Sequence, residues 1–167
     1  MIKNFNSLFV TMFGLGKVQF IPGTISSLAT IIILYILFHI LSIPPFLILA
    51  GLVIISIYSF LAIASYIENN KNKDPKEIVI DEFIGQSIPI YLYEISHGTE
   101  KSQDEAIIFY AICFVLFRFF DIRKPFPVSY FDQNYKNSFG VIMDDVCAGL
   151  YVVLSLICFM VLINYFI

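Results

Sequence analysis

The chain has 167 residues, of which 59% are hydrophobic and only 14% are charged, and its formal net charge is −3. A soluble domain carries about a quarter charged residues, so the composition excludes an ordinary soluble protein and indicates a single membrane-embedded domain, residues 1–167. The small net charge and the scattered basic residues argue against nucleic-acid binding.

The N-terminal part of the chain is more polar than the part that follows it. Residues 1–13 mix polar and apolar side chains and are expected to form a short amphipathic segment at the membrane surface. Residues 14–27 (GLGKVQFIPGTISS) are rich in glycine and small hydroxyl side chains, which predicts a loop. Ser26 and Ser27 are candidate N-caps for the apolar run that comes next.

Three long apolar runs are typical of membrane-spanning helices. Residues 28–43 and 46–66 are separated by a break at Pro44 and Pro45, so they predict a helical hairpin that crosses the membrane twice. Residues 149–167 are also almost entirely apolar and predict a final crossing.

Two shorter apolar runs lie at residues 81–93 and 106–117, and neither reaches the roughly 20 residues of a standard spanning helix. Each still crosses if its polar end reaches a cavity lined by protein, where charged segments are tolerated. If both cross, nine of the ten Lys and Arg residues fall on one side, with only Lys101 opposite. The positive-inside rule then predicts about five crossings, with the charged clusters in the cytoplasm.

Five carboxylates lie near the ends of these predicted helices on the inferred cytoplasmic side. They are Asp81, Glu82, Asp121, Asp144 and Asp145. Clustered carboxylates repel one another unless a cation lies between them, and we expect all five to act as ligands of Mg²⁺ or as catalytic groups. Any one of them alone is as well explained as a favourable charge at a helix start. If the three acidic clusters meet on the inferred cytoplasmic side, a metal site explains them better than separate favourable charges at helix starts.

Residues 118–127 (RFFDIRKPFP) place three cations directly after an apolar run. Beside a hard-metal site, Arg118, Arg123, Lys124 and the earlier Lys17 are suited to hold phosphate oxygens. Each of them taken singly is equally suited to anchor a helix end at lipid headgroups.

Two hydrolytic schemes stay open at this point. The sequence contains no GxSxG motif, and the spacing of a Walker A phosphate loop is absent from residues 14–27. Water is the simplest nucleophile, with a carboxylate as its base. A phospho-enzyme formed on Asp121 or Asp81 is the other scheme.

Four blocks together resemble the signature regions of one family. They are PGTISSL at 22–28, IVIDEFIGQ at 78–86, FRFFDIRKPFPVSYFD at 117–132 and GVIMDDVCAG at 140–149. In this order and spacing they look like the signatures of the phosphatidylglycerophosphatase A family, and with the apolar runs between them they cover nearly the whole chain. The third block, with its FR-x-x-D-x-x-KP-x-P pattern, is the most specific.

The resemblance implies an all-helical, Mg²⁺-dependent lipid phosphatase of the bacterial inner membrane, with its active site facing the cytoplasm. Its substrate would be phosphatidylglycerophosphate, which loses its terminal phosphate to give phosphatidylglycerol. The positions that match the family are Asp81, Glu82, Asp121, Lys124, Asp144 and Asp145. The expected contacts to the substrate phosphate are Lys17, Thr24, Arg118 and Lys124.

Two other functions are compatible with the predicted helices. An ion or metal transporter would use membrane carboxylates as a relay, but such residues usually lie near the middle of the membrane. A membrane scaffold without chemistry explains the apolar runs but not the repeated acidic pairs. Carboxylates at helix ends beside cations therefore favour chemistry on a lipid headgroup.

Overall fold

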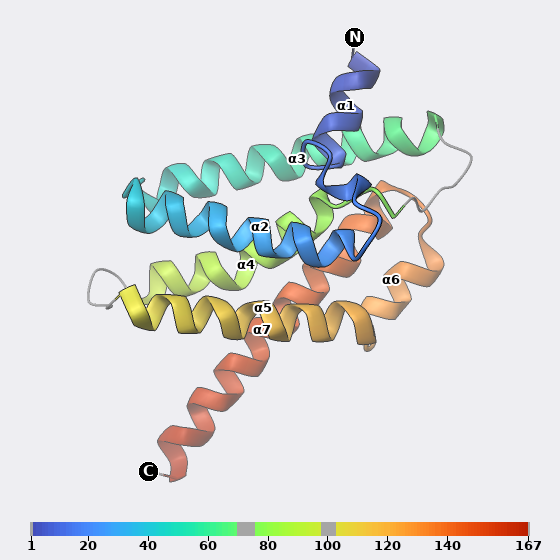
Figure 1. The fold of residues 1–167 in the computed structure, drawn as a ribbon. Helices are drawn as coiled ribbons and strands as arrows, with labels where there is room; N and C mark the ends of the chain where they lie inside the picture. Colours follow the sequence, from blue (N-terminus) through green and yellow to red (C-terminus); the bar gives the residue numbers. More distant parts are fainter. Residues whose placement is uncertain (1, 70–75, 98–102, 167) are drawn as a thin grey trace.

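The computed structural model describes residues 2–69, 76–97 and 103–166, and within these residues every regular element is helical, which confirms the predicted all-α class. Lys101 lies outside the described residues. The elements shown in Figure 1 are, in chain order, α1 (Ile2–Val10), η1 (Leu15–Lys17), α2 (Pro22–Tyr35), η2 (Ile36–Ile40), α3 (Pro45–Asn69), α4 (Ile80–His97), α5 (Gln103–Arg123), α6 (Val128–Asn134) and α7 (Ser138–Phe166).

Three helical stretches are long and apolar enough to cross a membrane: Pro22–Ile40, Pro45–Glu68 and Ser138–Tyr165. They agree with the predicted hairpin and with the predicted final span. The two short apolar runs also fold as helices, α4 and α5, which extend beyond the runs to 18 and 21 residues. The chain therefore has a helix for each of the five predicted crossings, and three of these helices have the length and composition of a membrane span.

Helix α4 is central because it packs against α2, α3, α5 and α7. It approaches α7 closely at two glycines. A Cβ atom on Gly85 would lie 2.5 Å from the carbonyl oxygen of Asp145, and one on Gly149 would lie 2.3 Å from the carbonyl oxygen of Gly85. No larger residue fits at either position, so the glycines allow the two backbones to meet, as small residues do in membrane helix pairs. Asp145 is thereby held beside the start of α4.

Helix α2 begins earlier than the sequence predicts. Pro22 takes the first helical position, where its missing N–H is not needed, so the predicted loop at 14–27 ends before it. Ser26 and Ser27 are buried inside the helix, and their prediction as N-caps is wrong. Ser26 Oγ instead donates a hydrogen bond to the carbonyl oxygen of Val79 at 2.8 Å, which ties α2 to the residues that lead into α4.

Helix α7 also begins earlier than the predicted span at 149–167. Asn137 caps the helix, since its Oδ1 accepts the backbone N–H of Gly140 at 3.0 Å. Asp144 and Asp145 therefore lie about two turns inside α7 instead of before its start. Their side chains are set by the geometry of a regular helix packed against α4.

Candidate active site

A cavity of about 410 Å³ opens at the end of the bundle where α2, α4 and α7 begin and α5 ends. Its lining contains eight of the nine residues predicted for the site: Thr24, Asp81, Glu82, Arg118, Asp121, Lys124, Asp144 and Asp145. Lys17 is the exception, because it is exposed on η1 and does not line this cavity. Of the described residues, six carboxylates and four cations line the cavity, which leaves an excess of two formal negative charges.

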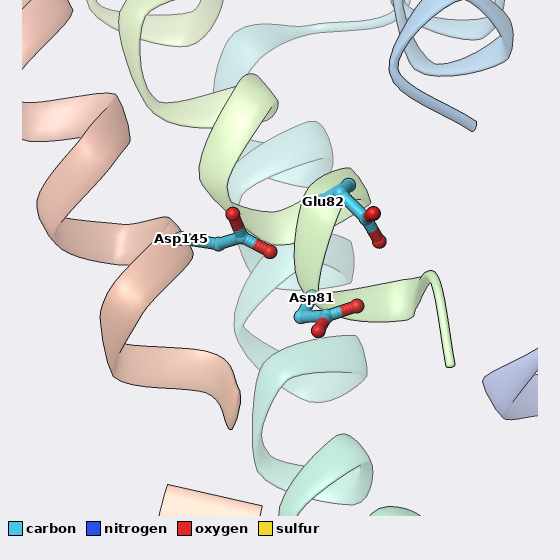
Figure 2. A group of neighbouring side chains, drawn as sticks. All are labelled: Asp81, Glu82 and Asp145. Atoms are coloured by element: carbon cyan, nitrogen blue, oxygen red, sulfur yellow. The ribbon is translucent and has the colours of Figure 1, made fainter. Parts of the chain in front are cut away.

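Asp81, Glu82 and Asp145 form an acidic triad at this cavity. One carboxylate oxygen of each lies within 4.8 Å of the other two. Figure 2 shows Asp145 extending from α7 toward the first turn of α4, which carries Asp81 and Glu82. Asp81 and Asp145 are only 8% and 4% exposed. Each member also has one buried oxygen without a hydrogen-bond partner among the described residues, namely Asp81 Oδ1, Glu82 Oε2 and Asp145 Oδ1.

The acidic triad fits a divalent cation. The three carboxylates repel one another, and Asp81 and Asp145 have lost most of the solvation of water, so the charged forms need a counter-ion. Hard cations such as Mg²⁺ and Ca²⁺ take carboxylate oxygens as ligands, and the unpartnered oxygens supply them. The described residues within this group include no histidine or cysteine, so the donor set does not favour zinc.

Arg118 lies on α5 and contributes a positive charge close to the acidic triad. Its Nη1 is 2.7 Å from Asp121 Oδ2, an ion pair between residues one helical turn apart. Arg118 Nε and Nη1 are buried and make no well-aligned hydrogen bond to the described residues, so the guanidinium keeps donors for a ligand. Gly23 leaves room for this arrangement, since a Cβ atom there would lie 2.2 Å from Glu82 Oε1 and 3.2 Å from Arg118 Nη1.

Lys124, Asp132 and Asp144 form a second group, the paired cluster. Lys124 Nζ donates to Asp132 Oδ1 at 2.7 Å and to Asp144 Oδ2 at 2.9 Å. Asp144 Oδ1 in turn accepts the backbone N–H of Asp145 at 3.0 Å. Lys124 has a φ of 43°, a left-handed conformation that residues with a side chain rarely adopt, and its two carboxylate contacts help to hold it there.

The charge of Lys124 is set by two opposing effects. Partial burial lowers the pKa of Lys124, whereas the neighbouring carboxylates Asp144 and Asp132 raise it, and the net shift of the pKa is upward. The ammonium group therefore stays protonated at neutral pH. It acts as a fixed positive charge at the rim of the cavity.

The structure divides the five predicted carboxylates by their partners. Three belong to the acidic triad, which forms no ion pair with a cation among the described residues, whereas Asp121 is paired with Arg118 and Asp144 with Lys124. A cation site next to unused guanidinium donors suits a phosphate group, whose oxygens need both kinds of partner.

Four charged or polar residues of the cavity were not predicted as site residues: Lys76, Asp132, Tyr135 and Lys136. Asp132 is the last residue of the 117–132 block, so its position was visible in the sequence. The contact of Asp132 with Lys124 was not visible in the sequence, because the turn between α5 and α6 brings the two residues together. Lys76 and Lys136 had been counted only as charges that set the topology.

Comparisons with known proteins point to one family. The family model described as Phosphatidylglycerophosphatase A matches residues 8–160. A phosphatidylglycerophosphatase A of Haemophilus influenzae is 36% identical over 142 residues, which cover 85% of this chain and 80% of that protein. A phosphatidylglycerophosphatase A of Escherichia coli K12 is 32% identical over 142 residues, which cover 82% of this chain and 73% of that protein.

A third relative carries a different name. A Bacteroides thetaiotaomicron protein, named as a candidate phosphatidylinositol-3-phosphatase, is 35% identical over 145 residues, which cover 84% of each chain. No solved structure matches this chain.

Proposed function

The chain belongs to the phosphatidylglycerophosphatase A family, and from this membership we propose that it converts phosphatidylglycerophosphate to phosphatidylglycerol and inorganic phosphate. The observation that carries the proposal is the buried acidic triad beside Arg118, whose guanidinium keeps unused donors. Neither the transporter nor the scaffold alternative has comparable support, since each leaves the family membership and the paired cations unexplained.

Mg²⁺ is the proposed cofactor, and Asp81, Glu82 and Asp145 are its proposed ligands. Their three unpartnered oxygens support this choice. When bound, the ion supplies Lewis-acid stabilisation of negative charge on the phosphate oxygens. Asp121 and Asp144 were also predicted as ligands, but each is paired with a cation of the chain, so the proposal gives them other roles.

The substrate phosphate is proposed to bind between the acidic triad and the start of α2. Arg118 donates to two phosphate oxygens from the N–H groups that its ion pair with Asp121 leaves available, a contact to which the planar guanidinium is suited. Thr24 lies in the first turn of α2, where backbone N–H groups and the helix dipole favour an anion. Lys124 adds a fixed positive charge. Lys17 has no part in this proposal because it lies outside the cavity lining.

Asp121 is the proposed base. It lines the cavity, does not belong to the acidic triad, and is held by its ion pair with Arg118. It accepts a proton from water as the water oxygen bonds to phosphorus and the bond from phosphorus to the glycerol oxygen breaks. The leaving glycerol oxygen takes up a proton from bulk water, and Asp121 returns its proton to solvent. A phospho-enzyme on Asp121 is the alternative, and acid quenching of a reaction with radiolabelled substrate distinguishes the two by protein-bound label.

The proposal is tested by phosphate release from the purified protein in detergent. Wild type should release inorganic phosphate from phosphatidylglycerophosphate with Mg²⁺ and not with a chelator. Asp121→Asn should lose roughly 10²- to 10⁴-fold in kcat, the contribution of a general base. Asp104→Asn is the matched control, since Asp104 is an exposed acid at the other end of α5. No release by wild type with metal and lipid substrate would refute the proposed activity.

Substrate selectivity is proposed to favour phosphatidylglycerophosphate, the substrate named by the family model and by two of the relatives. The Bacteroides relative makes phosphatidylinositol 3-phosphate the natural competitor, because it is also a phosphate monoester on a lipid headgroup. Both lipids should be assayed at equal surface concentration. A higher kcat/KM for phosphatidylinositol 3-phosphate would reverse the assignment.

Five crossings, a bacterial inner membrane and a cavity facing the cytoplasm are proposed for the topology. Three apolar spans and the positive-inside distribution of the sequence support it. Single cysteines at Asp104 and Lys136, in a background with Cys158 replaced by serine, should label from opposite sides of the membrane. Labelling of both by an impermeant reagent outside intact cells would contradict the five crossings.

A further inference from the structure

A second cavity of about 490 Å³ lies between α2 and α5, away from the acidic triad. Among the described residues, its lining contains no charged side chain and comes from α2, η2 and α5: Leu28, Ile31, Ile32, Tyr35, Ile36, Ile40, Ile107, Tyr110, Ala111 and Phe114. We call it the α2–α5 groove. In Figure 1 the two helices run alongside each other with α4 behind them.

The α2–α5 groove continues the line of the first cavity along both of its walls. Thr24 lines the first cavity and Leu28 the groove, four residues apart on α2. Arg118 lines the first cavity and Phe114 the groove, again four residues apart on α5. Residues four apart lie on the same face of a helix, so one face of each helix passes from the phosphate-binding end directly into the groove.

The length of the groove matches one leaflet of a bilayer. From Leu28 to Ile40 the chain advances twelve residues, or at most about 18 Å at the α-helical rise of 1.5 Å per residue, since Ile36–Ile40 form a wider π-helix with a smaller rise. The hydrocarbon core is about 30 Å thick, so one leaflet contributes about 15 Å. An acyl chain whose headgroup lies at the first cavity therefore reaches the far end of the groove.

The floor of the groove is apolar although it contains a tyrosine hydroxyl. Tyr110 OH donates to Glu94 Oε1 on α4 at 3.1 Å, which leaves the phenol ring to face neighbouring apolar groups. Tyr35 packs edge-on against this ring, with 6.1 Å between the ring centroids. The two rings are thus fixed against each other.

We propose that the α2–α5 groove binds one acyl chain of the phospholipid substrate while its phosphate enters the acidic cavity. The inference rests on the proposed function, because the occupant is the substrate of that reaction. It extends that function by giving the enzyme a second, apolar subsite, so that a diacyl substrate is recognised at both ends. Two other occupants would contradict the proposal. One is bulk lipid that fills the groove without preference, and the other is a second copy of this chain.

Filling the groove tests the proposal. Ala111 is an exposed residue of the groove on α5, and Ala111→Leu and Ala111→Trp would fill it by increasing amounts. Ile108→Trp is the matched control, since Ile108 lies on the same helix, is 61% exposed and does not line the groove. KM and kcat should be measured with diacyl phosphatidylglycerophosphate in mixed micelles and with its deacylated, water-soluble headgroup.

We expect Ala111→Trp to raise KM for the diacyl substrate roughly tenfold, the effect of losing about two buried methylenes. Its kcat/KM for the deacylated headgroup should equal that of wild type, which also shows that the variant is folded. Ala111→Leu should give an intermediate KM, and Ile108→Trp should behave as wild type. Equal losses on both substrates, or equal losses in the control, would overturn the groove proposal. Hydrolysis of neither substrate by wild type would instead refute the proposed function.

Crosslinking provides a measurement that does not need turnover. A phosphatidylglycerophosphate analogue with a photoreactive group in mid-chain should label Ile32 and Ala111, and unlabelled substrate should compete while phosphatidylcholine does not. Labelling spread evenly over α2, α3 and α7 would identify bulk lipid as the occupant. An Ile107→Cys variant lacking Cys158 that forms disulfide-linked dimers in the membrane would identify a second copy of the chain, and either result overturns the proposal.

Discussion

The acidic triad and the paired cluster lie in one cavity and both contain aspartates, yet they differ in charge balance. In the triad, one oxygen of each of three carboxylates lies within 4.8 Å of the others, and none of the three forms an ion pair within the part of the chain that the structure describes. In the paired cluster, Lys124 lies 2.7 Å and 2.9 Å from its two carboxylates. Asp144 and Asp145 are neighbours in sequence and fall on opposite sides of this division, because successive residues of a helix point about 100° apart.

The difference separates a group of carboxylates that needs a bound cation from a group that already contains a cation of the chain. The triad has buried oxygens without partners, so a bound cation changes its energy strongly. The paired cluster already holds an ammonium group between its two carboxylates, and its contribution is to fix Lys124 in an unusual backbone conformation at the cavity rim. Substitutions in the two groups should therefore fail in different ways.

Asp145→Asn should give the largest effect, because it removes one ligand of the triad while keeping the shape of the side chain. We expect activity to fall about a thousandfold or more, since a metal supplies several kcal/mol of transition-state stabilisation and each tenfold is about 1.4 kcal/mol. Without metal, the variant should melt at a higher temperature than wild type, because one repelling buried charge is gone.

The measurement is thermal unfolding in detergent with and without Mg²⁺, together with turnover. Mg²⁺ should raise the Tm of wild type and of the exposed control Asp104→Asn, and it should raise the Tm of Asp145→Asn much less. An equal rise of Tm in Asp145→Asn would show that the triad is not where the cation binds.

The sequence predicted which residues line the cavity better than it predicted which carboxylates pair with which cations. Carboxylates and cations are conspicuous in so apolar a chain, and the four blocks placed them in order, so eight of nine chosen residues line one cavity. Which carboxylates pair with which cations depends on the crossing of α4 and α7 at Gly85 and Gly149, a contact between segments far apart in the sequence. No spacing rule contains that information.

The sequence-based predictions differ from the structure where the first residue of a helix was placed too far along the chain. The start of α2 was placed after Ser27, so residues 14–27 were predicted to be a loop from which Lys17 contacts the substrate phosphate. In the structure Lys17 is exposed on η1 and does not line the cavity. Pro22 was the signal for the earlier start, since proline favours the first position of a helix. Asp132 was overlooked for a related reason, because no helix was predicted at residues 128–134, which form α6.

Asp132→Asn should have a smaller effect than any change in the triad, because Asp144 still holds Lys124. We expect turnover to fall about tenfold, as for a positioning contact worth roughly 1.4 kcal/mol, and the Mg²⁺-induced rise of Tm to be unchanged. Asp132→Glu should restore part of the turnover, since it keeps the charge.

A double-mutant cycle with Lys124→Met makes the same comparison quantitative. Contacting residues of one ion-pair network typically show coupling of about 0.5–3 kcal/mol, and we expect Lys124 to couple in this range to Asp132 and not to Asp145. Coupling of Lys124 to Asp145 as strong as to Asp132 would mean that the triad and the paired cluster are one network.

The smallest expected effect is the response of the paired cluster to alkaline pH. Since the pKa of Lys124 is raised above the ordinary lysine value of about 10.4, the stability it contributes is fully present below that value and is lost only as the pH rises through the higher folded pKa. The difference in Tm between wild type and Lys124→Met should therefore stay constant from about pH 7 to about pH 10 and shrink only above it. A difference that already shrinks between about pH 8 and about pH 10 would mean that burial outweighs the two carboxylates, and Lys124 would then be a titrating group of the cavity instead of a fixed charge.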